Sequence, residues 1–152
     1  MKLTDLYDSR LVRIRLPGRT KTEILRSMAA LFVEAGKVTD LERFIADLQA
    51  RELSFSTGVG RGLAIPHGKS EVVSTAAYAV ATLSDPFLWD ADDDETTNLV
   101  VMLAVPAREA GTTHLKMLST FAAALMDDGF RTALVNATTE ADIRSALQTR
   151  GA

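Results

Sequence analysis

The sequence predicts an α/β fold: a single domain over residues 1–152, in which a β-sheet is covered by helices on both faces. Segments with alternating hydrophobicity interleave along the chain with segments of helical periodicity, as α/β domains require. The run from Leu99 to Val105 is wholly apolar, which suits a central strand that is buried on both sides. No proline- or serine-rich linker and no internal repeat interrupts the chain, so one domain with a substantial core is expected.

Alternating apolar and basic residues predict the first strand, from Val12 to Leu16, with one buried and one solvated face; it ends at Pro17-Gly18. Thr20 and Glu23 then have the spacing of a capping box. The apolar positions after this cap lie on one helical face until Gly36 ends the helix. They are Ile24, Met28, Leu31 and Phe32.

A second capping box, Thr39 with Glu42, predicts a second helix that ends near Arg51. Its apolar stripe consists of Leu41, Phe44, Ile45 and Leu48. Two further strands are expected, one from Ala76 to Leu83 and one from Asn98 to Val105.

The acidic segment from Asp90 to Glu95 lies between these two strands. A calcium loop of the EF-hand type needs a glycine at its sixth position and a glutamate at its twelfth, and neither is correctly spaced here. The segment is therefore interpreted as a solvated loop.

Two more helices are expected in the last third of the chain. Thr112 or Thr113 caps the first, which carries His114 in its first turn and stops near Gly129. Its inward residues are predicted to be Leu115, Leu118, Ala122 and Leu125. Thr139 caps the second helix, whose apolar positions are Ile143, Ala146 and Leu147.

Composition narrows the possible functions. The net charge is −3 and no basic cluster alternates with aromatic residues, so neither nucleic acid nor an anionic membrane surface is an expected partner. Cysteine is absent, which excludes disulfides, thiolate metal sites and a cysteine nucleophile. Asp5 interrupts the region where a signal peptide would be apolar, and no apolar run reaches membrane-spanning length. A cytoplasmic location without membrane insertion is expected.

The most distinctive segment runs from Ser56 to Lys69, with the sequence STGVGRGLAIPHGK. It contains a glycine-rich turn, a short apolar strand and then His67 in a loop. The chain has only one other histidine, His114, so a side chain that can act as a neutral nucleophile near pH 7 is scarce. Pro66 restricts the backbone before His67, and Gly68 frees it afterwards.

Other chemistries fit this segment poorly. A P-loop has four residues between its glycines, whereas five separate Gly62 from Gly68, and Pro66 lacks an amide donor. A dinucleotide-binding fingerprint would need a glycine where Leu63 stands. Metal-dependent hydrolysis is weakly supported, because the two histidines lie 47 positions apart and would have to find a carboxylate. No Gly-x-Ser-x-Gly elbow is present, so histidine itself is the leading candidate nucleophile.

A phosphohistidine needs one ring nitrogen with a free lone pair and the other held protonated. The bound phosphoryl group needs backbone amides, a helix N-terminus or a cation to stabilise its negative charge. The chain offers amides from Gly58 to Gly62, a helix start near Thr113, and the cations Arg51, Arg61 and Lys69.

Four segments form a specific combination in this order: Arg51-Glu52, Ser56-Thr57-Gly58-Val59-Gly60, Gly62-Leu63-Ala64-Ile65-Pro66-His67, and Thr113-His114-Leu115 with Leu118. Together they resemble the fructose/mannitol-type (type 2) enzyme IIA domain of the bacterial phosphotransferase system, a family that includes a nitrogen-regulatory branch. The resemblance covers nearly the whole chain. It implies a mixed, mostly five-stranded sheet flanked by helices.

The resemblance also implies roles for three residues. His67 would carry the phosphate on the ring nitrogen remote from Cβ, His114 would help to hold that phosphate, and Arg51 would lie close to the site. Neither a metal nor an organic cofactor would take part. From the residues alone, His114 could instead cap its helix or lie at the surface, and Arg51 could complement the C-terminal dipole of its helix.

Two functions are compatible with the resemblance. In the first, His67 accepts phosphate from the phosphocarrier protein HPr and passes it to an enzyme IIB domain in fructose- or mannitol-like sugar uptake. In the second, the phosphorylation state of His67 controls binding to regulatory target proteins. Arg61 stands where the family often has a small polar residue such as Asn, and the loop 90–95 is richer in acidic charge than the family leads one to expect. The motif alone does not choose the partner.

Overall fold

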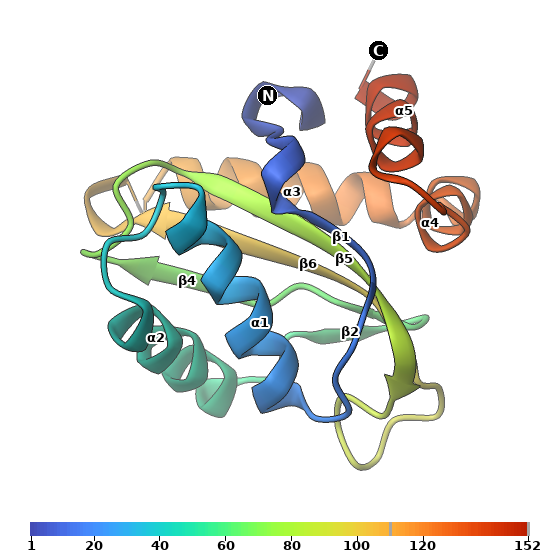
Figure 1. Cartoon of the computed structure of the whole chain (residues 1–152), viewed down its shortest axis with the longest axis horizontal. Helices are drawn as coiled ribbons and strands as arrows, with labels where there is room; N and C mark the ends of the chain where they lie inside the picture. Colours follow the sequence, from blue (N-terminus) through green and yellow to red (C-terminus); the bar gives the residue numbers. More distant parts are fainter. Residues whose placement is uncertain (110, 152) are drawn as a thin grey trace.

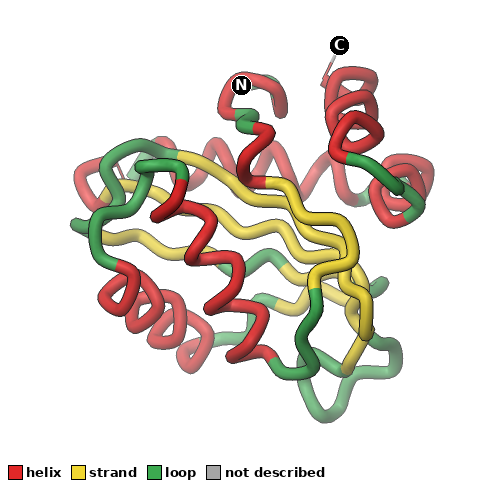
Figure 2. The backbone as a smooth tube through the Cα atoms, viewed as in Figure 1, coloured by secondary structure: helices red, strands yellow, loops and turns green. Residues whose placement is uncertain are grey.

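Six strands form one mixed sheet in the middle layer of the fold, within residues 1–109 and 111–151 that this computed structural model describes (Figures 1 and 2). The strands are β1 (Val12–Leu16), β2 (Gly58–Gly60), β3 (Leu63–Ala64), β4 (His67–Ser70), β5 (Ala77–Phe87) and β6 (Thr97–Pro106). The α-helices are α1 (Lys21–Glu34), α2 (Leu41–Ser54), α3 (Thr113–Leu125), α4 (Asp128–Val135) and α5 (Glu140–Gly151). Short 3-10 helices span Leu3–Leu6, Ser9–Leu11 and Ala107–Glu109. No helix in the described residues has the length and hydrophobicity needed to cross a membrane.

The strand order is β1-β5-β6-β3-β2, and β4 also pairs with β6. Strand β5 runs antiparallel to β6, whereas β1 is parallel to β5, and β3 and β4 are parallel to β6. β3 and β4 lie end to end along the same side of β6, because Leu63 pairs with Leu99 and His67 pairs with Leu103. The predicted mixed sheet is therefore confirmed, with this interrupted strand counted as two.

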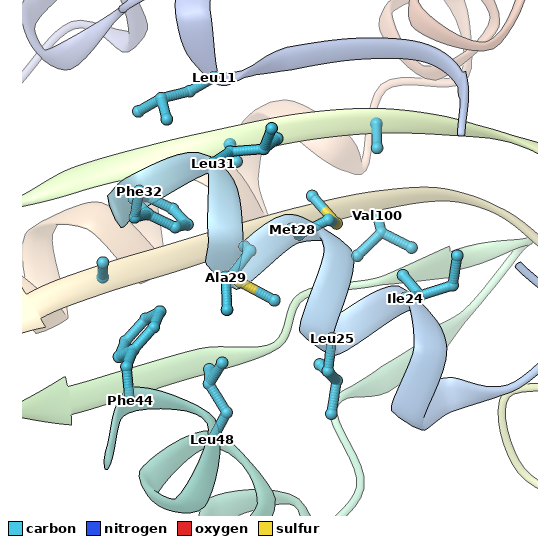
Figure 3. Close-up of a cluster of buried hydrophobic side chains, with 14 of the residues drawn as sticks. Leu11, Ile24, Leu25, Met28, Ala29, Leu31, Phe32, Phe44, Leu48 and Val100 are labelled. Atoms are coloured by element: carbon cyan, nitrogen blue, oxygen red, sulfur yellow. The ribbon is translucent and has the colours of Figure 1, made fainter. Parts of the chain in front are cut away.

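The core consists of two clusters, one on each face of the sheet. In β5, Ala79 and Ala81 face the cluster under α1 and α2, whereas Tyr78 and Val80 face the cluster under α3, α4 and α5. Figure 3 shows the first cluster, where Phe32 and Phe44 join the two helices. Residues 99–105 of β6 are all buried, so the predicted central strand and the helices on both faces are confirmed.

The cap of α1 agrees with the prediction, but that of α2 does not. Thr20 accepts a hydrogen bond from the amide of Glu23 at 3.1 Å, as expected. For α2, Asp40 caps the helix by accepting from the amide of Arg43 at 3.1 Å. The amide and the hydroxyl of Thr39 donate instead to the carbonyl of Val72, at 2.9 and 3.3 Å. The prediction of Thr39 as the cap was wrong, because a neighbouring loop engages both of its donors.

The alternation predicted from Val12 to Leu16 is broken near its end. Arg15 has a φ of 57°, and the register with β5 shifts between Arg13 and Leu16. Val12 packs in the cluster under α3 to α5, whereas Leu16 packs against the cluster under α1 and α2. The strand therefore contributes apolar side chains to both faces of the sheet.

The C-terminal third differs most from the prediction. Helix α3 ends at Leu125, and Gly129 lies in the first turn of α4, a helix that was not predicted. The buried face of α3 consists of His114, Met117, Phe121, Ala124 and Leu125. Leu125 was correctly placed inward, whereas Leu115 and Ala122 are exposed and Leu118 is half-buried. In α5, Ile143 and Leu147 are buried as predicted.

Replacing the observed cap of α2 provides a test of this register. We expect Asp40→Ala to lower the free energy of unfolding by about 1 kcal/mol, because the amide of Arg43 loses its acceptor. Asp40→Asn retains an acceptor and serves as the matched control, with an expected change of only a few tenths. Urea denaturation measures both. A larger loss for Thr39→Ala than for Asp40→Ala would contradict the assignment.

Candidate functional site

His67 is the first residue of β4 and is 6% exposed. The prediction that it lies in a loop was therefore wrong, and the break in the strand comes just before it, at Pro66, which has no N–H for the ladder. A Cβ on Gly68 would lie 2.9 Å from Cε1 of Phe44 and 3.2 Å from Cδ2 of Leu48, so α2 packs directly against the backbone of β4 (Figure 1). This close approach brings Arg51 of α2 to the histidine.

Two hydrogen bonds fix the ring of His67. Its Nδ1 lies 2.9 Å from the carbonyl oxygen of Ile65, and its Nε2 lies 3.0 Å from Nε of Arg51. A carbonyl only accepts hydrogen bonds, and a guanidinium only donates them. The ring is therefore neutral, with its proton on Nδ1 and its lone pair on Nε2.

His114 lies beside this ring although it comes from α3, on the other side of the sheet from α2. The two ring centroids are 4.9 Å apart, with 44° between the ring planes. His114 is 8% exposed, and its buried Nδ1 makes no hydrogen bond to any residue among 1–109 and 111–151. The structure thus brings together the three residues predicted for the site: His67, His114 and Arg51.

Burial keeps both histidines neutral near pH 7. It lowers the pKa of His114 to about 4, and the neighbouring ring of His67 acts in the same direction. Burial also lowers the pKa of His67, and the hydrogen bond to Ile65 opposes that shift while the charge of Arg51 adds to it. A neutral imidazole is the form that can act as a nucleophile.

The three candidate cations have different positions. Arg51 contacts His67 directly. Lys69 lies two residues beyond His67 in β4, so both side chains leave the same face of the strand. Arg61 instead pairs with Asp128 of α4 at 3.6 Å. Within residues 1–109 and 111–151, no three His, Asp or Glu side chains gather as metal ligands would.

Residues 5–149 match the family model described as phosphoenolpyruvate-dependent sugar phosphotransferase system, EIIA 2. The chain belongs to this family. It is therefore an EIIA domain of the phosphoenolpyruvate-dependent sugar phosphotransferase system type.

Comparisons with individual proteins support the family assignment. This EIIA domain is 38% identical over 152 residues to the 2-O-alpha-mannosyl-D-glycerate-specific EIIABC component of Escherichia coli K12, covering 99% of this chain but only 23% of that protein. It is 34% identical to the fructose-specific EIIA component of Haloferax volcanii, over 90% of this chain and 88% of that one. Its fold matches the nitrogen regulatory protein IIA-Ntr of Neisseria meningitidis with a TM-score of 0.84 at 26% identity, covering 94% and 97% of the two chains.

The EIIA domain also has a polar network that sequence reasoning missed. Glu52 accepts hydrogen bonds from the amide and the hydroxyl of Thr57, and Lys21 lies 3.5 Å from Glu52 and 3.0 Å from Asp90. Asp90 in turn accepts from the hydroxyl of Ser56. In the loop predicted to be solvated, the carboxylate of Asp90 is therefore anchored to Ser56 and Lys21. Arg51-Glu52 was noted only as a motif, and no sequence spacing links Lys21, Glu52 and Asp90.

The low pKa of His114 predicts a pH-dependent stability. The unfolded chain binds a proton at His114 near pH 6.5, whereas the folded protein does so only near pH 4, so stability falls as the pH drops from 6.5 to 4. We expect His114→Gln to remove about 1 to 2 kcal/mol of the loss seen between pH 7 and pH 4.5. Urea denaturation of both proteins at the two pH values measures this difference, and equal losses would contradict a buried neutral His114.

Proposed function

We propose that this EIIA domain carries its phosphoryl group on Nε2 of His67, accepts it from the phosphohistidine of HPr, and passes it to an enzyme IIB domain in sugar uptake. The observation that carries the proposal is the hydrogen bond between Nδ1 of His67 and the carbonyl of Ile65. It leaves the lone pair on Nε2, which is the nucleophile that phosphoryl transfer requires.

In the transfer step, Nε2 of His67 forms a bond to phosphorus while the N–P bond of the donor breaks and its electron pair returns to the donor ring. No proton has to leave His67, because Nδ1 keeps its hydrogen. Positive charge develops on the acceptor ring, and the carbonyl of Ile65 stabilises it through the Nδ1–H bond.

Arg51 has to release Nε2 before phosphorus can approach. Its Nη1 also donates to the carbonyl of Phe55 at 2.6 Å, which holds part of the guanidinium at the end of α2. A modest swing of Nε away from His67 would place the charged donors beside the phosphoryl oxygens. The helix-end role and the phosphate role of Arg51 are therefore compatible.

His114 is suited to hold the phosphoryl group. At 8% exposure it is not a surface residue, and its ring lies next to that of His67. A neutral imidazole has one N–H to donate, and a phosphoryl oxygen would provide the partner. Its position in the first turn of α3 also places the positive end of a helix close to the site.

Exposed apolar side chains beside the site support a protein partner. Leu53 is 89% exposed and Phe55 is 76% exposed, both just after Arg51, and Leu115 is 62% exposed next to His114. Apolar surface around a reactive group is typical of docking faces. The sugar-specific names of the EIIABC and EIIA relatives favour sugar uptake over control of regulatory targets. An encounter with HPr would take place in the cytoplasm.

Phosphorylation with enzyme I, HPr and labelled phosphoenolpyruvate tests the site. We expect acid-labile label on the native protein and none on His67→Ala, because Nε2 of His67 is the acceptor. Adding an enzyme IIB domain of a sugar permease should then remove the label. Undiminished labelling of His67→Ala would contradict the assignment. Label that no sugar-type IIB domain accepts would favour the regulatory function.

Single-turnover rates of phosphorylation test the two supporting residues. We expect Arg51→Ala and His114→Ala each to slow transfer by about tenfold or more, because each removes a donor to the phosphoryl group. Lys116→Gln, on the exposed face of α3, is the control and should leave the rate unchanged. Native rates in His114→Ala would indicate a purely structural role for His114.

A further inference from the structure

The side chain of Glu52 is 8% exposed and holds the segment that precedes the glycine-rich turn. One carboxylate oxygen accepts from the amide of Thr57 at 2.6 Å, and the other accepts from its hydroxyl. Both oxygens are thus engaged by the same residue. We call this pair of hydrogen bonds the Glu52–Thr57 clamp. Because Thr57 is itself buried, the clamp lies inside the protein and not at its surface.

Backbone hydrogen bonds continue from this clamp to the reacting ring. The carbonyl of Thr57 accepts from the amide of Ile65 at 2.9 Å, and the carbonyl of Ile65 lies 2.9 Å from Nδ1 of His67. Two hydrogen bonds therefore lie between Thr57 and the imidazole. The position of the Ile65 carbonyl depends on where Glu52 holds Thr57.

Lys21 supports the same clamp from α1. Its Nζ lies 3.5 Å from Glu52 and 3.0 Å from Asp90, and it sits 5.2 Å from the ring centroid of Trp89. Asp90 accepts from Ser56, and Ser56 accepts from the amide of Gly58 at 3.1 Å. One ammonium group therefore joins the two carboxylates that hold consecutive residues, Ser56 and Thr57.

We propose that Glu52 is a positioning residue for phosphoryl transfer: by clamping Thr57 it fixes the Ile65 carbonyl, which selects the ring form of His67 with Nε2 unprotonated. This inference rests on the proposed function only in taking His67 as the phosphorylated residue. Glu52 touches neither the ring nor the phosphoryl group, and it acts through Thr57 and Ile65.

A carboxylate suits this position best. Two donors from Thr57 need two acceptors, and a glutamate supplies both. A glutamine can accept from the Thr57 amide, but its NH2 group would then donate to the Thr57 hydroxyl, which reverses that hydrogen bond, and its neutral side chain would lose the attraction to Lys21. A free imidazole has no fixed tautomer, and with the Ile65 carbonyl displaced only the N–H of Arg51 would oppose a proton on Nε2, so the Nε2–H form would gain population.

Nitrogen-15 NMR of the histidine rings at a pH where both are neutral reads this effect directly. In the native protein we expect His67 to be in the Nδ1–H form alone. In Glu52→Gln we expect a mixed population with the Nε2–H form, together with phosphorylation by phospho-HPr that is slower by about tenfold. A role in overall stability alone would leave the tautomer of the folded protein unchanged.

Matched variants separate this effect from a loss of charge or of folding. Glu42→Gln removes a carboxylate from the same helix, where Glu42 is exposed and pairs with Arg26, and it should leave both tautomer and rate unchanged. Thr57→Val removes one donor to Glu52 and should reproduce the mixed tautomer, whereas Thr57→Ser retains the hydroxyl and should restore the native form. Thr57→Val also provides the test if Glu52→Gln does not fold.

Native tautomer and native rate in folded Glu52→Gln would overturn the positioning role. The ring spectrum needs no phosphoryl donor, so the two proposals can fail separately. If His67→Ala were still labelled by phospho-HPr, the proposed function would be wrong. Glu52 would then have no role in phosphoryl transfer, even if Glu52→Gln changed the ring spectrum. If His67 were the labelled residue and Glu52→Gln kept a single tautomer, only the clamp would fall.

Discussion

The hydrogen bond from Nδ1 of His67 to the carbonyl of Ile65 is the interaction on which the proposed phosphoryl transfer by this EIIA domain depends. Together with the N–H of Arg51 on Nε2, it decides which ring nitrogen bears the lone pair. It forms where the strand along β6 is interrupted, with Pro66 between β3 and β4. The geometry of that break turns a backbone carbonyl toward a side chain instead of toward a neighbouring strand. An edge strand interrupted at one proline can therefore present a histidine ring in a single tautomer.

Two layers of helices complete the site from opposite sides of the sheet. Helix α2 packs against Gly68 and brings Arg51 to Nε2, while α3 brings His114 beside the ring. Because this packing removes both histidines from water, their pKa values fall and both rings stay neutral near pH 7. Within the described part of the chain, the same burial leaves Nδ1 of His114 without a hydrogen-bond partner, beside the proposed nucleophile.

Local sequence signals predicted much of the fold but not its details. The helix at Thr20, the wholly apolar strand β6 and the layers on both faces could be predicted because spacing and hydrophobic period are local properties. The cap at Asp40, the switch of Leu16 to the other face and the burial of His114 could not. Each depends on a partner elsewhere in the chain: Val72 for Thr39, the register with β5 for Leu16, and the sheet for α3.

The sequence by itself determined which groups are available: two histidines, no cysteine, and an Arg-Glu, Ser-Thr-Gly and Ile-Pro-His combination that marks the family. Only the tertiary structure decided what these groups can do. The tautomer of His67, the neutrality of His114 and the clamp that links Lys21, Glu52 and Thr57 all arise where distant segments meet. Hydrogen-bond direction and desolvation depend on which groups lie close together in the fold, because both act over a few ångströms in space and not along the chain.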